Sequence, residues 1–243
     1  MPAERAARPR LRKDAELNRL RILAAAREVF RDRGVAATLN DVAHHAGLGV
    51  GTVYRRFADK EELVDALFAD MVNTVEAYTR EALEHEDAWT GLVTALERVC
   101  EIQALDRGLR EVMLGTGRGP QRQAQIGARI APLVDRLVEK AQRQGTLRPD
   151  LVPPDLPVLQ LMVAAVTDHT GQPTLWRRYL ALVIDGIRAR PEGQNTALPP
   201  PFGSPDQVQE ALMESSVRAA ADRDSAARGR ARRAALRHRS SGG

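Results

Sequence analysis

The sequence has one cysteine, few aromatic residues and no long apolar run. Cys100 has no second cysteine with which to form a disulfide within the chain, and no nearby His or Cys with which to bind zinc. Only 4% of the residues are aromatic, and most apolar residues are Ala, Leu and Val, which favours helices over sheets. The longest apolar run, 161–166, is far shorter than the ~20 residues of a membrane span. The charged N-terminus is not followed by the apolar part of a signal peptide. We therefore expect an all-α, cytoplasmic protein without a membrane segment.

The motifs of several enzyme classes are also missing. The sequence contains no Gly-rich phosphate loop, no Gly-x-Ser-x-Gly turn and no His-Glu-x-x-His motif. His44 and His45 have no metal-ligating partner at helical spacing, so they are interpreted as surface residues. A redox role for Cys100 would require a lowered thiol pKa, which the nearby Glu97 and Glu101 oppose. An enzymatic function has little support in the sequence, and no cofactor is expected.

The charges are distributed unevenly along the chain. Residues 1–60 carry 13 Lys and Arg against 7 Asp and Glu, residues 61–214 carry 15 against 23, and residues 215–243 carry 8 against 2. Such a separation is typical of a polyanion-binding head on an acidic body, because phosphate contacts need Lys and Arg. A solvated charge pattern without a binding role is the alternative.

The N-terminal part predicts a long helix followed by a short one. Apolar residues recur at helical spacing over 18–33, and Gly34 follows as a stop signal. Thr38 and Asp41 then form a capping-box pattern, in which a hydroxyl and a carboxylate bond to backbone N–H groups at a helix start. A short helix over 39–46 is the expected result.

A turn and two further helices follow. Gly47 can take the positive φ of a tight turn, and Gly49 is a tolerated N-cap for a short helix over 50–57. Asp59 with Glu62 repeats the capping-box pattern at the start of a long fourth helix. The two short helices and the turn between them have the dimensions of a helix-turn-helix.

The helix over 50–57 satisfies the physical demands on a DNA recognition helix. Val53 and Phe57 are four residues apart, so both can anchor the helix to the core. Small residues at its start allow close approach to base edges, and Thr, Tyr and Arg supply donors for phosphate oxygens. The residues left to face outward or sideways are Val50, Gly51, Thr52, Tyr54, Arg55 and Arg56. On periodicity alone, a helical hairpin with no DNA-binding role is the alternative.

Residues 46–63 read Ala-Gly-Leu-Gly-Val-Gly-Thr-Val-Tyr-Arg-Arg-Phe-Ala-Asp-Lys-Glu-Glu-Leu. They resemble the signature of the tetracycline-repressor (TetR) family, in which a turn precedes Gly-Thr-(Leu/Val)-Tyr, a basic or His residue, Phe, and Lys before a long helix. The resemblance covers about residues 17–70. Gly49 departs from the Ser or Thr cap that is common there, at a cost of only a few tenths of a kcal/mol. Arg56 stands where His is frequent, and it strengthens a phosphate contact.

The resemblance implies a set of DNA contacts. Tyr54, Arg56 and Lys60 match positions that contact backbone phosphates, and Thr38 and Thr52 match phosphate-contacting hydroxyls. The positions that face bases are matched by Asn40, Val50 and Gly51. An Asn can bond an adenine edge through two hydrogen bonds. Since Val50 and Gly51 offer few hydrogen bonds, specificity is expected to rest also on Arg55, on the N-terminal arm and on DNA shape.

The body is expected to hold two copies together and to bind an effector. A single recognition helix is too small for specificity, so operator binding needs two copies about one helical turn apart. Helices over 156–169, capped by Asp155, and 174–189, capped by Thr174, are the most apolar part of the chain and form the expected homodimer interface. The resemblance also implies a small, largely apolar effector. Residues that are candidates for its pocket, but individually typical of core or surface, are Trp89, Cys100, Arg110, Met113, Met162 and His169.

Four segments are therefore predicted: a basic flexible arm over 1–16, a helix-turn-helix DNA-binding domain over 17–62, a ligand-binding and dimerisation domain over 63–190, and a mostly disordered basic tail over 191–243. The arm, with Arg5, Arg8, Arg10, Arg12 and Lys13, either contacts a groove or phosphates, or serves solubility alone. The overall expectation is a repressor of double-stranded operator DNA. An architectural DNA-binding protein without an effector is the alternative.

Overall fold

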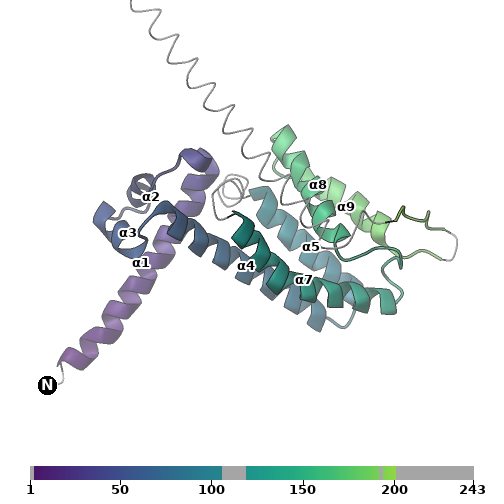
Figure 1. Ribbon diagram of the computed structural model, residues 1–243, viewed down its shortest axis with the longest axis horizontal. Helices are drawn as coiled ribbons and strands as arrows, with labels where there is room; N and C mark the ends of the chain where they lie inside the picture. Colours follow the sequence, from purple (N-terminus) through teal and green to yellow (C-terminus); the bar gives the residue numbers. More distant parts are fainter. Residues whose placement is uncertain (1–2, 106–118, 192–193, 201–243) are drawn as a thin grey trace, which may run out of the picture.

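The computed structural model describes residues 3–105, 119–191 and 194–200. Its elements are α1 (Ala3–Arg33), a 3-10 turn (Gly34–Ala36), α2 (Leu39–His45), α3 (Val50–Arg56), α4 (Lys60–Glu84), α5 (Ala88–Leu105), α7 (Gly119–Arg143), α8 (Asp155–Thr170) and α9 (Trp176–Ile187) (Figure 1). Within these ranges there is no strand, only an isolated bridge between Leu147 and Arg188. The predicted all-α fold class is confirmed. None of the helices in this part of the chain is both long and apolar enough to cross a membrane.

A small head forms one end of the molecule and a larger body the other, and α4 runs from the first into the second (Figure 1). The head has its own core, built from α1, α2, α3 and the first half of α4, together with Ile130 of α7. Its fully buried side chains include Ile22, Phe30, Val42, Val53, Leu63 and Leu67. The predicted boundary at residue 62 falls at the start of α4, whereas the head core continues along this helix as far as Val72. The division between the two cores therefore lies within a continuous helix.

The local signals at the start of α2 are confirmed. The backbone N–H of Asp41 donates to Thr38 Oγ1 at 3.2 Å, and the N–H of Thr38 donates to Asp41 Oδ2 at 2.9 Å, which is a complete capping box. At the start of α4 only one of the two hydrogen bonds of the capping box forms. Asp59 Oδ1 accepts from the N–H of Glu62 at 2.8 Å, but the Glu62 carboxylate accepts from Ala58 at 2.6 Å and not from Asp59. Both helix starts thus have their free N–H groups bonded by side chains of neighbouring residues.

The N-terminal helix is longer than predicted. The sequence pattern predicts its start near residue 18, after a flexible arm, but α1 is helical from Ala3 and extends away from the head (Figure 1). The physical reason is that residues 3–17 are mostly Ala, Arg, Glu and Leu, which are strong helix formers. Once the packed part around Ile22 and Phe30 has nucleated the helix, each further residue except Pro9, which has no backbone N–H, can add a backbone hydrogen bond at little cost.

In the body, α5 and α7 pack on the second half of α4, and α8 and α9 pack on α5. Its core contains Leu92, Leu96, Leu137, Val138, Val163, Trp176 and Leu180. The starts of its last two helices differ from the prediction. The residues at their N-cap positions are Pro154 and Leu175, without a side-chain cap, so Asp155 and Thr174 are not the caps. Asp155 instead accepts from the N–H of Val152 at 2.9 Å, because it lies inside the first turn and its carboxylate reaches back to the preceding loop.

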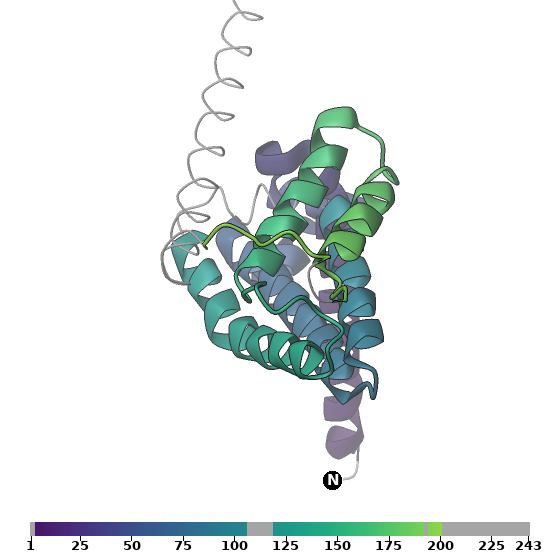
Figure 2. The ribbon, with the colours of Figure 1, turned by 90° about the vertical axis from the view of Figure 1, so that its right-hand side faces the viewer.

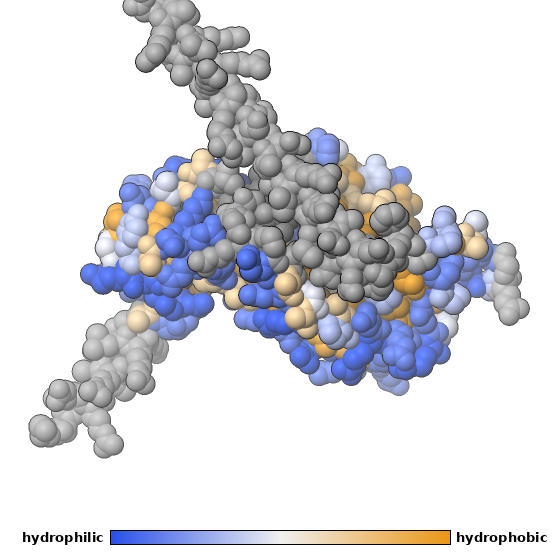
Figure 3. Space-filling view, viewed as in Figure 1, coloured by the Kyte–Doolittle hydropathy of each residue, from blue (hydrophilic) through white to orange (hydrophobic). Residues whose placement is uncertain are grey.

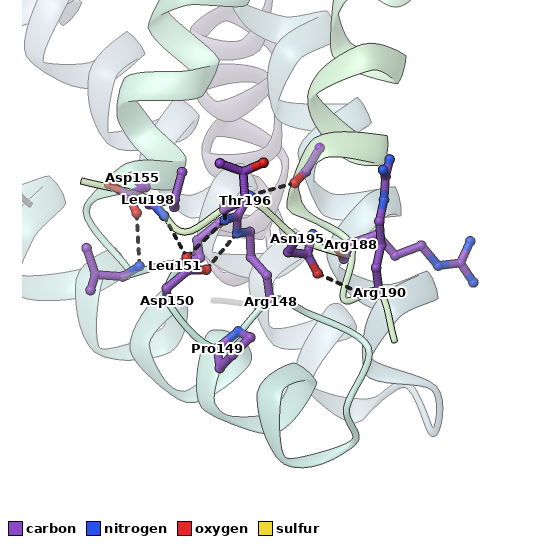
Figure 4. A network of polar contacts seen from close by, with 12 residues as sticks. Arg148, Pro149, Asp150, Leu151, Asp155, Arg188, Arg190, Asn195, Thr196 and Leu198 are labelled. Carbon is purple, nitrogen blue, oxygen red and sulfur yellow. Dashed lines mark hydrogen bonds and ion pairs between the residues drawn. The ribbon is translucent and has the colours of Figure 1, made fainter. Parts of the chain in front are cut away.

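The first part of the chain after α9, residues 194–200, is held against the body. Figure 4 shows the contacts that hold residues 194–200, and in Figure 2 this segment crosses the end of the body that faces the viewer. Buried Arg148 donates to Thr196 O at 2.6 Å, and Asp150 Oδ2 accepts from the N–H of Leu198 at 2.9 Å. Arg148 and Asp150 are themselves paired at 2.6 Å. The predicted disorder of 201–243 lies outside the described residues.

Candidate nucleic-acid interface

A tight turn places α3 across the end of α2. Gly47 has φ of 63°, as the sequence predicts, and a side chain there would be strained. The N–H of Leu48 donates to Ala43 O at 3.0 Å, which closes the end of α2. Gly49 then serves as the N-cap of α3 with φ of −63° and no side-chain cap. The predicted helix-turn-helix is therefore present with its caps and turn at the expected residues.

One side of α3 is anchored and the other is open to solvent. Val53 is fully buried in the head core and Phe57, which follows the helix, is 2% exposed. Val50 and Tyr54, by contrast, are 45% and 48% exposed, although both are large apolar or aromatic side chains. Large apolar groups on an open helix face commonly mark a contact surface.

The other residues predicted to contact DNA also reach the surface of the head. Thr52 and Lys60 are half-buried, whereas the exposed ones are Thr38, Asn40, Gly51, Arg55 and Arg56. They come from the start of α2, from α3 and from the start of α4, and α2 packs directly against α3. Within α3, Arg55 Nη2 donates to Thr52 Oγ1 at 3.2 Å, so the two polar side chains hold each other on the surface.

Lys60 is the first residue of α4 and lies partly over the head core. Its Nζ is 5.5 Å from the centre of the Phe30 ring, a cation–π distance. Burial lowers the pKa of Lys60, and the neighbouring Glu61 carboxylate opposes that shift. A bound anion such as a phosphate would favour the charged form of Lys60 and so oppose the effect of burial on its pKa. Arg56 lies over the Phe57 ring in the same way, at 5.4 Å.

Hydrogen bonds and ion pairs of charged side chains hold α2 against α1. Hydrogen bonds from the Thr38 side chain and backbone lower the pKa of Asp41, and Arg33 adds to this effect. Arg33 lies 2.5 Å from the Asp41 carboxylate. His44 and His45 are both exposed, as predicted, and His45 Nε2 lies 2.6 Å from a Glu28 carboxylate oxygen. These contacts join α2 to α1 and hold Asn40 and Thr38 in place.

The structure does not bring the candidate ligand residues together. Trp89 packs against the body core, and Arg188 stacks on its ring at 5.2 Å. Cys100 is buried in the same core, and burial raises its thiol pKa to about 12, so it has the properties of a core residue and not of a reactive thiol. Met162 and His169 are exposed on α8. The remaining two, Arg110 and Met113, lie outside the described residues.

Two buried arginines are not predicted from the sequence. Arg122 of α7 is paired with Glu61 and Asp65 of α4, and Arg148 is paired with Asp150 beside the C-terminal segment. The carboxylates that Arg122 binds lie 57 and 61 residues away in the sequence. No local spacing links such residues, so only the packing of α7 on α4 reveals them.

The two halves of this architecture both match known protein families. Residues 22–67 match the model described as "Bacterial regulatory proteins, tetR family". Residues 87–189 match that of the "Transcriptional regulator SbtR-like, C-terminal domain". The chain belongs to the TetR family. It is therefore a DNA-binding transcriptional regulator and not an enzyme, and the two matches together cover more than half of its length.

Individual members of the TetR family support this assignment. The regulator UidR of Escherichia coli K12 is 28% identical over 143 residues, which are 57% of this chain and 73% of UidR. A TetR regulator from Mycobacterium vanbaalenii has the same fold with a TM-score of 0.58 and 28% identity, over 74% of this chain and 99% of that one. FadR of Bacillus subtilis, solved with stearoyl-CoA, has a TM-score of 0.56 at 20% identity, over 69% and 98%. This last similarity concerns the fold alone.

Proposed function

We propose that this TetR-family chain represses transcription by binding a palindromic operator as a homodimer, and that a small, largely apolar molecule releases it. The observation that carries the DNA-binding part is the division of α3 into a buried and an exposed side. Because Val53 and Phe57 fix the helix to the core, the exposed Val50 and Tyr54 project from a rigid support. A rigid helix with a solvent-facing side can enter the major groove without rearrangement.

The proposed contacts divide into two kinds. Lys60, Arg56, Tyr54, Thr38 and Thr52 would bind phosphates, which fixes the head on the duplex without reading its sequence. The residues that would face base edges are Asn40, Val50, Gly51 and Arg55. The exposed Asn40 at the start of α2 has the side chain best suited to reading an adenine.

The N-terminal extension of α1 narrows the role proposed for the basic arm. An α-helix is about 10–12 Å wide with its side chains, whereas the minor groove of B-DNA is about 6 Å wide. A helical arm from Ala3 onward therefore does not fit the minor groove. If the arm contacts the operator, we expect it to follow backbone phosphates.

The dimer is proposed to form through α8 and α9. Both helices expose large apolar side chains although they pack on the body core: Leu161 and Met162 on α8, Tyr179 and Leu182 on α9. Figure 3 shows apolar residues at the surface in the part of the body where α8 and α9 lie. Two such helices from each copy would form a four-helix interface.

The proposed interface is tested by a charge substitution. Leu182→Arg should give monomers in light scattering. Leu17→Arg on α1, where Leu17 is similarly exposed, should leave the dimer intact.

The experiment that tests the DNA-binding proposal is selection of bound duplexes from a random pool. A palindromic motif with half-sites about one helical turn apart is the expected result. Affinity for this motif should exceed that for arbitrary DNA by about 10³ or more, whereas an architectural protein would show a ratio near ten. A motif without two-fold symmetry, or no motif, would contradict the dimeric repressor.

Two variants test the assigned contacts on the selected operator. Lys60→Ala should weaken binding to all sequences and reduce the slope of log affinity against log salt by about 1, since one phosphate contact is lost. Tyr54→Ala should weaken binding with no change in that slope, because a neutral donor releases no counterion. Arg143→Gln removes a positive charge from an ion pair in the body and is the control. Wild-type affinity in both test variants would refute these assignments.

The effector is proposed to bind in the body. FadR, with the same fold, was solved with stearoyl-CoA, whose acyl chain is apolar, so stearoyl-CoA is the first probe. The body residues Trp89 and Cys100, together with Arg110 and Met113, remain candidates for contacting it. Added stearoyl-CoA should release the operator in a mobility-shift assay and raise the melting temperature of the free protein. A panel of apolar ligands that never weakens operator binding would contradict the effector part and leave the DNA-binding part untouched.

A further inference from the structure

Arg122 is one of the few charged side chains with a low exposed fraction in the described part of the chain, at 2%. It lies near the start of α7, and its guanidinium faces the first two turns of α4. Nη2 donates to Glu61 Oε2 at 2.8 Å and to Asp65 Oδ1 at 2.7 Å, and Nε donates to Asp65 Oδ1 at 2.9 Å. The carboxylates are about one third exposed. Burial of a full charge is costly unless such bonds compensate it, so this contact holds only in a narrow range of geometries.

A second arginine repeats this contact further along the same two helices. Arg129 Nη2 donates to Asn73 Oδ1 at 2.8 Å, and its Nε donates to Glu76 Oε2 at 2.9 Å. Arg122 and Arg129 are two helical turns apart, about 10 Å, and therefore lie on one face of α7. Asp65 and Asn73 are separated by about 12 Å along α4. The two helices run in the same direction, and two arginines join them at two matching levels.

These contacts connect the two cores. The first half of α4 belongs to the head core through Leu63 and Leu67, whereas α7 spans both cores, with Ile130 in the head core and Leu137 in the body core. Figure 1 shows α7 alongside α4 where α4 leaves the head. A single contact point would still allow α4 to pivot against α7. Two contact points at different levels resist both rotation and sliding of the head against the body.

We propose that Arg122 and Arg129 are positioning residues that set the placement of the DNA-binding head on the body, and so the distance between the two recognition helices of the dimer. This inference rests on the proposed binding of a palindromic operator. Apparent affinity for a two-site ligand falls by the fraction of molecules whose two sites have the correct separation. A head that is free to move would populate the correct spacing less often, although each head would still bind its half-site normally.

The variants remove the contact without touching a proposed DNA contact. Arg122→Met removes the guanidinium and keeps an unbranched apolar side chain. Because a buried charge partner is lost, a second variant, Arg122→Met with Asp65→Asn, also removes the carboxylate that accepts two of the bonds named above and leaves Glu61, beside Lys60, unchanged. Arg129→Gln removes the second contact at a site that is 41% exposed, where the folding cost is small. The control is Arg143→Gln, whose ion pair with Glu139 lies entirely within α7.

The readout is binding to three duplexes: the selected palindrome, the palindrome with one base pair inserted between its half-sites, and a single half-site. We expect about a tenfold loss of affinity for the palindrome in the Arg122 variants, and a smaller loss in the same direction for Arg129→Gln. Half-site affinity should be unchanged, and the preference for the correct spacing should shrink by the same factor as the palindrome affinity. The control should equal the wild type.

Two results would overturn the inference. The first is wild-type affinity and spacing preference in folded variants, as judged by circular dichroism. The second is an equal loss for palindrome and half-site, which would mean that the arginines act inside the head and not on its placement. If the wild-type protein shows no preference for a palindrome over a half-site, the proposed dimeric function itself fails. That failure is visible before any variant is measured.

Discussion

Gly91 marks a point where two helices of the body touch backbone to backbone. It is buried and is the fourth residue of α5, and a Cβ atom added there would lie 2.5 Å from the carbonyl oxygen of Ala82 on α4. The Ala82 carbonyl carbon and Cα would each be 3.2 Å away. Ordinary contacts between carbon and oxygen are about 3.3 Å or longer. Because the obstacle is backbone and not a flexible side chain, Gly91→Ala requires α4 and α5 to move apart by about 0.8 Å.

The expected change in stability combines a cost and a gain. Overpacking of this kind costs about 1–3 kcal/mol, while replacing Gly by Ala within a helix gains about 0.5–1 kcal/mol. The cost of the clash exceeds the gain in helix propensity, so we expect a net loss of about 1 kcal/mol in the free energy of unfolding. For a protein of this size, that lowers the melting temperature by about 2–4 °C.

The assay is thermal unfolding followed by circular dichroism, with all proteins at one concentration because dimerisation affects the melting temperature. Gly51→Ala is the matched control, since a Cβ at Gly51 meets nothing within 4 Å and α3 gains helix propensity. The control should be as stable as the wild type or slightly more stable. A Gly91→Ala protein that melts at or above the wild-type temperature would refute the close contact between α4 and α5.

Three further predictions concern the C-terminal segment and the buried thiol. Asp150→Asn should expose residues 194–200 to proteolysis at neutral pH, about tenfold faster than in the wild type, because the Arg148 guanidinium and the Leu198 N–H lose a charged partner. In the wild type, Arg148 first and then the Leu198 N–H lower the pKa of Asp150 below its ordinary value of 3.8. Because the pKa of Asp150 is lower in the folded state, the ionised carboxylate stabilises the attached segment above pH 3.8. This stabilisation is lost only as the pH falls through the pKa of the folded state. Hydrogen exchange at Leu198 should therefore stay protected at pH 4. Cys100 should react with a thiol reagent at pH 8 at least about a hundredfold more slowly in the folded protein than in denaturant, since burial raises its pKa to about 12.

Each of these predictions has its own control. Asp185→Asn removes the carboxylate of an exposed ion pair with Arg190 and should leave the proteolysis rate unchanged. Equal cleavage rates in the wild type and Asp150→Asn would show that the Arg148 contacts do not retain the segment. Loss of protection at Leu198 already at pH 5 would contradict the lowered pKa of Asp150. Rapid labelling of Cys100 in the native protein would mean that the body core opens readily.

The local features of the head followed from the sequence because their physics is local. Thr38 caps α2 through a residue three positions away, and Val53 and Phe57 share the buried side of α3 because they are four positions apart. Gly47 takes a positive φ that other residues avoid. The same interactions operate in any tertiary context, so the helix-turn-helix and its outward-facing residues were predictable. The predicted start of the first helix was wrong because α1 continues to Ala3, past Pro9, through residues that are otherwise strong helix formers.

The contacts between distant segments depended on the tertiary structure. Arg122 and Arg148 look like any other surface arginine in the sequence, and only the packing of α7 on α4, and of residues 194–200 on the body, buries them. For the same reason the candidate ligand residues could not be sorted in advance: Cys100 became core and Met162 stayed exposed. The sequence by itself thus determined the caps, the turn and the open side of α3, where partners are neighbours along the chain. Only the tertiary structure decided how the head is fixed to the body, because a buried charge takes the partner that packing brings within hydrogen-bond distance.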